Sequence, residues 1–424
     1  MLLGYYSLKH YYKLIMVKST ATEVPSPVQN EKLLLFLLAV VQFTHILDFM
    51  IIMPLGKQFM QLFDISPQQF SWIVSVYAGS AFLIGFPSAM FIDRFDRKKA
   101  LMLVYAGFTI GTFACALSGS YYLFLAARAI TGAFGGVLSA LVLSIIGDTI
   151  PLKRRARAMG VVMTAFSAAS VVGVPVGLYL AAEYSWRMPF FVVAGVAAVF
   201  TGLILFFIPP LRRHLDSGKV QRNPLRVMGN IFQDSNQRMA LLFTVVLMLG
   251  HFTIIPFIAP YMQLNVGFSD YEVTYIYAVG GTLTIFLLPF FGRLADRFGR
   301  AKVFTLSSLA ALVSIFALTN LDTASIAIAL CVTSSFFVVA SGRSVPATTM
   351  VTAVVKPESR GSFMSVRTSI NQAAMGTASF VAGLIITEQG DESLGNYEIV
   401  GYIAILMSLL AIFLAWKLKA VDEE

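Results

Sequence analysis

Long apolar segments recur along the whole chain, and this recurrence limits what it can fold into. A helix of about 20 apolar residues crosses the hydrocarbon core of a bilayer, and about twelve segments reach that length. They are residues 33–55, 70–92, 100–118, 121–147, 158–182, 188–208, 239–263, 272–293, 302–320, 323–350, 361–387 and 397–416. Soluble proteins are about 25% charged residues, whereas this chain is 12% charged. The sequence therefore predicts an all-α membrane protein with twelve transmembrane helices.

One long connection divides the predicted helices into two groups of six. It is polar and basic, with Arg212, Arg213 and Lys219 among its residues, and the other connections are short. We expect a cytoplasmic N-terminal tail (1–32), a first six-helix bundle (33–208), a cytoplasmic interdomain loop (209–238), a second six-helix bundle (239–418) and a cytoplasmic tail (419–424).

The distribution of charge orients these helices. The chain has 31 Lys and Arg against 22 Asp and Glu, and nearly all the basic residues fall in the tails and in the connections on one side. In the loops of the other side, the only basic residues are Lys57 and Arg187. Because Lys and Arg concentrate on the cytoplasmic side of membrane proteins, we expect both termini to be cytoplasmic, with the protein in the inner (plasma) membrane. Orientation thus accounts for the net charge of +9, and no nucleic-acid partner is expected.

The second half of the chain repeats features of the first. Asp93 follows the second span and Asp296 follows the eighth, each at the start of a basic loop. His45 and His251 each precede a proline by nine residues. Both pairs are separated by about 205 residues, which indicates an internal repeat. Two halves in the same orientation, related by an axis along the membrane normal, are the expected result.

The loop after the eighth span carries a family motif. Gly292, Asp296, Arg297, Gly299 and Arg300 match the signature Gly-x-x-x-Asp-Arg-x-Gly-Arg of the major facilitator superfamily. The chain resembles that superfamily over nearly its whole length. The resemblance implies the major facilitator fold, with two pseudo-symmetric six-helix halves, and a secondary active transporter that works by alternating access.

Within that superfamily the chain is most similar to exporters. Gly173, Pro175 and Gly177 in the fifth span resemble the Gly- and Pro-rich motif of drug:proton antiporters and sugar-efflux permeases, whose usual order is Gly-Pro-x-x-Gly. This resemblance implies proton-coupled efflux of a drug, sugar or metabolite. The first-half copy of the loop motif has Ala89 and Asp96 where glycines are usual.

The first span carries two ionisable residues, His45 and Asp48. Such a residue at bilayer depth costs at least about 2.5 kcal/mol by insertion scales, and it usually marks a transport pathway. We expect Asp48 to bind a proton or substrate with Arg128 of the fourth span as its partner, the alternative being a structural ion pair. His45 could share the proton and His251 could flank the same cavity, or each could hydrogen-bond a neighbouring helix.

Two arginines lie inside second-half spans. Arg343, in the tenth, and Arg367, in the eleventh, could bind an anionic substrate group. Arg367 is also close enough to the end of its span for its side chain to extend to the cytoplasm.

Charged residues at the cytoplasmic ends of the spans form a candidate gate. We expect Asp93, Arg94, Arg97 and Asp148 to pair while that face is closed and to separate when the halves move apart. The second half contributes Asp296, Arg297 and Arg300. The alternative is that these residues only orient the protein in the membrane.

Other functions compete with efflux. Uptake by proton symport differs in direction only, and a facilitator would need no proton. A receptor would need an output module, and the loop 209–238 is too short for one. An enzyme would need a cluster of catalytic groups, which the sequence lacks. Cys115 and Cys331 lie in apolar runs, so no metal or cofactor is expected. The expected partners are a small-molecule substrate, protons and the lipid bilayer, and a monomer suffices.

Overall fold

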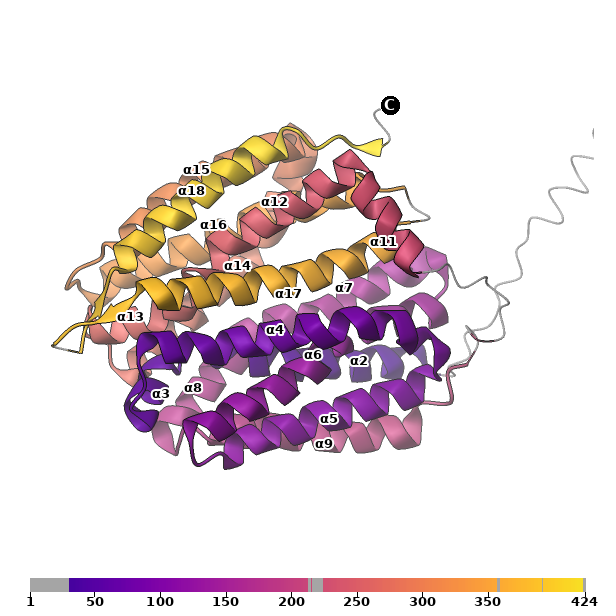
Figure 1. The fold of residues 1–424 in the computed structure, drawn as a ribbon, viewed down its shortest axis with the longest axis horizontal. Coiled ribbons are helices and arrows are strands. Elements are labelled where there is room, and N and C mark those ends of the chain that lie inside the picture. Colours follow the sequence, from indigo (N-terminus) through magenta and orange to yellow (C-terminus); the bar gives the residue numbers. More distant parts are fainter. Residues whose placement is uncertain (1–29, 213–214, 216–223, 357–358, 391, 422–424) are drawn as a thin grey trace, which may run out of the picture.

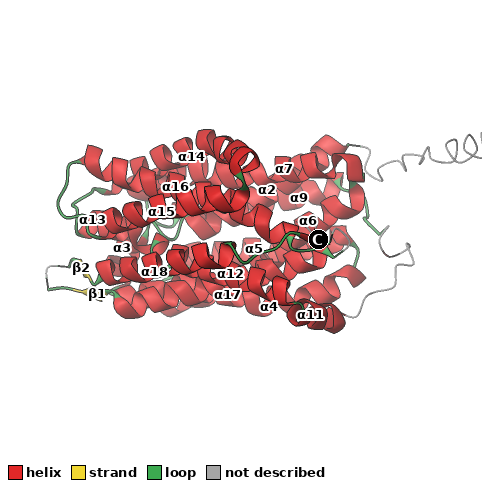
Figure 2. Ribbon diagram, turned by 90° about the horizontal axis from the view of Figure 1, so that it is seen from above, coloured by secondary structure: helices red, strands yellow, loops and turns green. Residues whose placement is uncertain are grey.

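The computed structural model describes residues 30–212, 215, 224–356, 359–390 and 392–421. These residues form a bundle of helices that run roughly along one axis (Figure 1 and Figure 2). Most of the predicted N-terminal tail and the last three residues of the predicted C-terminal tail lie outside the described residues.

The long helices follow the predicted six-plus-six order. The first half contains α2 (Glu31–Met50), α4 (Pro67–Phe91), α5 (Arg97–Leu117), α6 (Tyr121–Thr149), α7 (Leu152–Ala168), α8 (Val174–Glu183) and α9 (Met188–Phe207). The second half contains α12 (Ser235–Phe252), α13 (Ile258–Leu264), α14 (Asp270–Phe298), α15 (Arg300–Thr319), α16 (Ile326–Ala353), α17 (Arg360–Ile385) and α18 (Tyr397–Ala415).

Short elements connect these helices. They are α3 (Gly56–Phe63), α11 (Pro224–Gln233), the 3-10 turns η1 (Ile92–Arg94) and η3 (Ile255–Phe257), and the π-helical turn η2 (Ala169–Gly173). The strands β1 (Thr387–Glu388) and β2 (Leu394–Gly395) form an antiparallel pair. The predicted interdomain loop thus contains a helix, α11, which the sequence analysis did not predict.

The repeat extends to the helix caps. Ser66 starts α4, where its side chain accepts from the Gln69 amide and its own amide donates to the Gln69 side chain. Ser269 starts α14 with the same reciprocal bonds to Glu272. A capping box satisfies two amides that a helix start otherwise leaves unpaired. The same local chemistry therefore begins the second span of each half.

Eleven helical segments in the described part of the chain are long and apolar enough to cross a membrane. α17 is long enough at 26 residues, but polar residues such as Arg367, Asn371 and Gln372 lower its hydropathy. It runs beside α4, along the boundary between the halves (Figure 1). With α17 as the polar twelfth helix, the predicted all-α membrane fold is confirmed.

Prolines account for two differences from the predicted spans. The first helix ends at Met50 and not at residue 55, because Pro54 lacks an amide and its ring clashes with the carbonyl four residues earlier. The fifth span is interrupted by η2, because Pro175 likewise has no amide to donate to Val171. A π-helical turn absorbs such a gap without ending the span.

The apolar core has three parts. The first draws buried residues from both halves, from Leu47 to Ala404. The second draws its buried residues from the first half and the start of the interdomain segment, from Leu34 to Leu211. The third draws its buried residues from α11 and the second half, from Ile231 to Ala415, and Phe86 of α4 packs against it. We call them the shared core, the first-half core and the second-half core.

These cores lie at different ends of the bundle. The shared core lies at what we call the far end, opposite the termini end where α2 begins and α18 ends. There Phe70 packs on Phe257 of the other half with ring centroids 5.6 Å apart, and Gln58 Nε2 donates to Asp270 Oδ2 at 3.1 Å. The first-half and second-half cores lie at the termini end. The two halves are therefore joined at the far end and have separate cores at the termini end.

Candidate functional site

A buried ion pair links α2 to α6. Arg128 Nη1 donates to Asp48 Oδ2 at 2.7 Å, and both side chains are 0% exposed. The contact between the first and fourth spans was predicted, and it is confirmed. Thr112 of α5 donates to the other carboxylate oxygen, Oδ1, at 3.1 Å. Three helices of the first half therefore meet at one carboxylate.

Tyr77 of α4 covers this pair. The guanidinium carbon of Arg128 lies 4.3 Å from the centroid of the Tyr77 ring, a cation–π contact. Among the described residues, Tyr77 Oη and the Arg128 atoms Nε and Nη2 have no hydrogen-bond partner although they are buried. The site thus holds donors that a bound molecule or water could satisfy.

His45 lies beside this cluster and does not bond Asp48. Its ring packs against Tyr77 and Phe108, with centroids 6.5 and 6.1 Å away. Neither ring nitrogen has a hydrogen-bond partner among the described residues. The sequence predicted that His45 and Asp48 share one helix face, but Arg128 and Thr112 already occupy the carboxylate. Sharing a proton would require a bridging water or a rearrangement.

Glycines of α6 allow this close approach. A Cβ at Gly135 would lie 2.5 Å from Tyr77 Oη and 3.1 Å from His45 Nε2. A Cβ at Gly132 would overlap the backbone oxygen of Tyr77. Small residues let helix backbones pack closely in membranes. Their absent side chains are what place α4 against α6 at the site.

The exporter-like motif packs directly on α2. A Cβ at Gly173 would lie 2.9 Å from Leu47 Cδ1, and one at Gly177 would lie 2.7 Å from Ile51 Cδ1. Pro175 between them accompanies the π-helical turn η2. The motif therefore contacts Leu47 and Ile51, which flank Asp48 at the end of α2.

The second half has a different polar cluster. His251 Nε2 accepts from Arg343 Nε at 3.3 Å, and Arg343 Nη1 donates to Ser408 Oγ at 2.8 Å. His251 Nδ1 lies 3.1 Å from the carbonyl oxygen of Leu247. Ile254 takes the repeat position of Asp48, so no acid stands there. The described contacts of His45 and His251 place each histidine within its own half.

Aromatic side chains next to the two clusters meet between the halves. Phe49, which follows Asp48, and Phe252, which follows His251, have ring centroids 6.2 Å apart. Phe49 also packs on Tyr77 at 5.2 Å. Phe49, Tyr77 and Thr112 were not predicted as site residues. The repeat could not have revealed the aromatic pair, because it places Ile255 at the position of Phe49 and Ile46 at the position of Phe252.

Of the charges predicted as a gate, Arg97 and Asp148 pair with each other within the first half. Arg97 Nε donates to Asp148 Oδ2 at 2.9 Å. Arg94 is exposed, and the side chain of Asp93 lies outside the described residues. The second-half residues Asp296, Arg297 and Arg300 are exposed. The pair between Arg97 and Asp148 thus joins two helices of one half, at the end where the halves have separate cores. The role of these charges as a gate remains a prediction.

Asp96 explains why the first-half loop departs from the family motif. It caps α5 by accepting from the Lys98 amide, and it also accepts from the Leu211 amide at 3.1 Å and from Arg212 Nε at 2.9 Å. Burial raises the pKa of its carboxyl, but these hydrogen bonds outweigh burial and hold the pKa below its usual value. The second-half equivalent, Gly299, has φ +95° and could not be replaced so easily.

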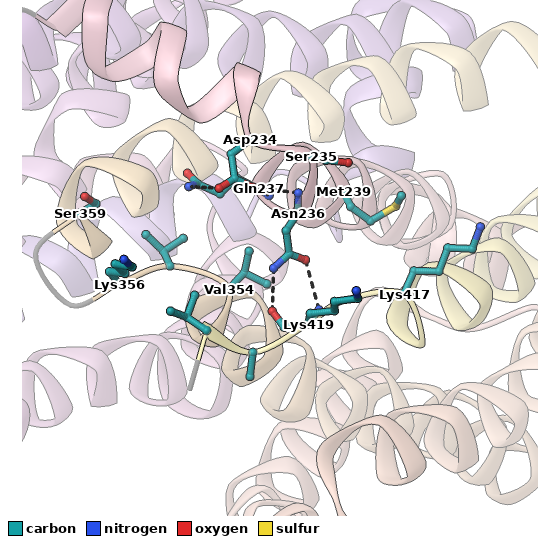
Figure 3. A pocket seen from close by; sticks show the side chains of 13 residues that line it. Asp234, Ser235, Asn236, Gln237, Met239, Val354, Lys356, Ser359, Lys417 and Lys419 are labelled. Carbon is teal, nitrogen blue, oxygen red and sulfur yellow. Dashed lines mark hydrogen bonds between the residues drawn. The ribbon is translucent and has the colours of Figure 1, made fainter. Parts of the chain in front are cut away.

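A surface cavity of about 550 Å³ lies away from both polar clusters, at the termini end of the second half (Figure 3). Asn236 of α12 bonds the backbone of Lys419 there, through Oδ1 and Nδ2. Lys356 and Lys417 also line it. The contact holds the segment that follows α18 against the start of α12.

Comparisons with known proteins place this geometry in a family. The sequence profile of the Major Facilitator Superfamily matches residues 38–249 and 240–424. A vacuolar membrane amino acid uptake transporter of Schizosaccharomyces pombe, fnx2, is 35% identical over 146 residues. That alignment covers 34% of this chain and 25% of the relative, so it spans about a quarter of that protein.

Solved structures share the fold over nearly the whole chain. A bacterial homologue of the human lysosomal transporter Spinster, inward-facing and unoccupied, has a TM-score of 0.71 and 17% identity, covering 91% of this chain and 96% of its own. A D-xylose-proton symporter has a TM-score of 0.73 and 16% identity, covering 89% and 96%. At these identities the likeness establishes the fold alone.

Proposed function

This chain belongs to the Major Facilitator Superfamily, whose profile matches both halves, and we propose that it is a proton-coupled transporter that exports a small molecule by antiport. It is a multi-pass membrane transporter and not an enzyme. The observation that supports proton coupling is the ion pair between Asp48 and Arg128, fully buried at the middle of the bundle.

Proton binding at Asp48 would remove one charge of that pair. Arg128 would then be a buried cation without a counterion, a costly state that favours rearrangement of its surroundings. Tyr77 and Phe49 connect the pair to α4 and to Phe252 of the other half. Protonation at Asp48 would thus change the stability of the contact between the halves.

The arrangement of the cores supports alternating access. The halves share one core at the far end and keep separate cores at the termini end, as expected for a state open toward the termini end. We infer that this end faces the cytoplasm, because it carries nearly all the basic residues. Rocking of the two halves about the central contact would open the far end. A proton would bind Asp48 more tightly in one of the two states than in the other, and this difference would shift their populations.

Export is supported by the Gly173-Val-Pro175-Val-Gly177 motif, which packs on α2 beside Asp48. Uptake by proton symport is the second candidate. It is favoured by the similarity to an amino acid uptake transporter of the vacuolar membrane. The substrate in either case would be a small molecule such as a drug, sugar or metabolite, and one copy of the chain provides both halves of the pathway.

The test is proton movement in liposomes. Purified protein would be reconstituted with a trapped pH dye and exposed to lipophilic cations, sugars and organic anions. Substrate-evoked proton flow opposite to the substrate, absent in Asp48→Asn and kept in the surface variant Lys57→Gln, would support antiport. Proton flow in the same direction as the substrate would support uptake. Substrate movement without any proton signal would reject proton coupling.

A further inference from the structure

Two buried arginines of the second half lack the carboxylate that Arg128 has. Arg343 on α16 is 1% exposed and Arg367 on α17 is 8% exposed. Arg343 bonds His251 and Ser408, which are neutral acceptors in these contacts. Arg367 Nη2 donates weakly to Thr348 Oγ1 at 3.4 Å. Among the described residues, neither guanidinium lies within 4.0 Å of an Asp or Glu oxygen.

Each of these arginines also keeps an unused donor. Arg343 Nη2 and Arg367 Nε are buried and have no partner among the described residues. A guanidinium is always charged and has five donors, so burying it without a counterion is unfavourable. In the first half the protein supplies the counterion, Asp48. In the second half the counterion must come from elsewhere.

The two arginines lie at the same stretch of α16, because Arg343 belongs to it and Arg367 contacts it. Arg343 stands between Ala340, which belongs to the shared core, and Ala347, which belongs to the second-half core. Arg367 reaches Thr348, little more than one turn further toward the termini end. This is the part of the bundle where the halves no longer share a core. The two cations therefore lie toward the end at which the halves are apart.

α17 brings Arg367 to the boundary between the halves. It runs beside α4 of the first half and α12 of the second (Figure 1). Its residues 368–373, which follow Arg367, are all partly exposed and include Asn371 and Gln372. A polar helix face at membrane depth is stable where it lines a wet pathway. Arg367 therefore lies beside a partly exposed stretch of α17 that contains polar residues, on a helix that runs along the boundary between the halves.

We propose that Arg343 and Arg367 bind a carboxylate of the transported molecule, so that the substrate is a small organic acid. The inference rests on the proposed transport function and names its substrate class. The planar fork of a guanidinium matches a carboxylate and bonds it with two donors. The substrate would then play in the second half the part that Asp48 plays in the first. The empty site carries two positive charges, and a bound carboxylate neutralises one of them.

Thermal unfolding of the purified full-length protein, followed by tryptophan fluorescence, tests this with matched probes. Benzoate, glutamate and succinate are each compared with the corresponding amide, and phenyl phosphate is compared with benzoate. We expect at least one carboxylate to raise the unfolding temperature while its amide does not. The half-saturating concentration should increase at least tenfold in Arg343→Gln and in Arg367→Gln. The half-saturating concentration should not change in Arg360→Gln, because Arg360 is an exposed arginine at the start of α17.

Several outcomes would overturn the inference. They are equal stabilisation by carboxylates and amides, stabilisation by phenyl phosphate alone, no stabilisation by any probe, or unchanged affinity in both variants. Arg343→Lys controls for folding, because it keeps the charge and loses the fork; it should bind more weakly than the native protein and more tightly than Arg343→Gln. Proton-coupled transport of amides in liposomes would reject the substrate class and leave the proposed function intact.

Discussion

Breaking the buried ion pair from one side should cost far more than removing both partners. Asp48→Asn leaves Arg128 as an uncompensated cation in a fully buried site. With an effective dielectric constant of about 20 and charge centres about 4 Å apart, the lost attraction is about 4 kcal/mol. This agrees with the roughly 3 to 5 kcal/mol usually lost when one partner of a buried pair is removed.

The double variant Asp48→Asn/Arg128→Gln removes both charges and should recover most of that loss. Arg128→Gln alone should cost less than Asp48→Asn, because the remaining acid can take up a proton and become neutral. The free energies of unfolding would be measured by denaturation in mixed micelles, and the double-mutant cycle gives the coupling between the two side chains.

A matched control is the pair between Arg154 and Glu31, 3.0 Å apart with side chains 55% and 22% exposed. Its cycle should give no more than about 1 kcal/mol, because solvent screens an exposed pair. If Asp48→Asn costs no more than this control, or if the double variant loses as much as the sum of the single variants, the reasoning is refuted.

Other predictions concern packing, pH and the far end. Gly132→Ala should destabilise by about 1 to 3 kcal/mol, because its Cβ meets the backbone of α4; Gly147→Ala, with open space around it, should not, and equal unfolding midpoints would contradict this. Because the pKa of Asp96 is lowered in the folded state, its carboxylate stabilises the fold above about pH 4, and this stabilisation is lost as the pH falls through the folded-state pKa. In unfolding measurements, Asp96→Asn should therefore be less stable than the native protein at pH 7 and equally stable at strongly acidic pH. A cleavable crosslink between cysteines introduced at Gln58 and Asp270 should stop transport until it is cleaved, since the far end must open; continued transport would show that it need not.

The number of spans and the repeat could be predicted because both depend on patterns about 20 or 200 residues long. The contact between Asp48 and Arg128 could also be predicted, since two opposite charges at bilayer depth have few other partners. Thr112 and Tyr77 could not, because a neutral polar residue in an apolar run looks the same whether it faces lipid or a neighbouring helix. Only the packing at Gly132 and Gly135 brings Tyr77 to the site.

Three local features were misjudged or missed for identifiable reasons. α2 ends early because Pro54 acts four residues upstream of its own position. Asp96 departs from the family glycine because it caps α5 in ordinary backbone geometry, with φ −54°. The sequence does not reveal that Arg343 has no carboxylate partner, because this depends on where every acid of the second half lies once the helices are packed.

The three-part core has a consequence for the energetics of turnover. The buried residues of the first-half core and of the second-half core come from opposite sides of the boundary, so each half can rotate as a rigid body without loosening its own interior. The shared core is then the part that is taken apart and rebuilt in each cycle, a local unfolding along one seam. Substitutions that pack the shared core more tightly would stabilise the protein and slow its transport cycle. Thermal stability and transport rate should therefore vary in opposite directions at these residues and independently of each other elsewhere.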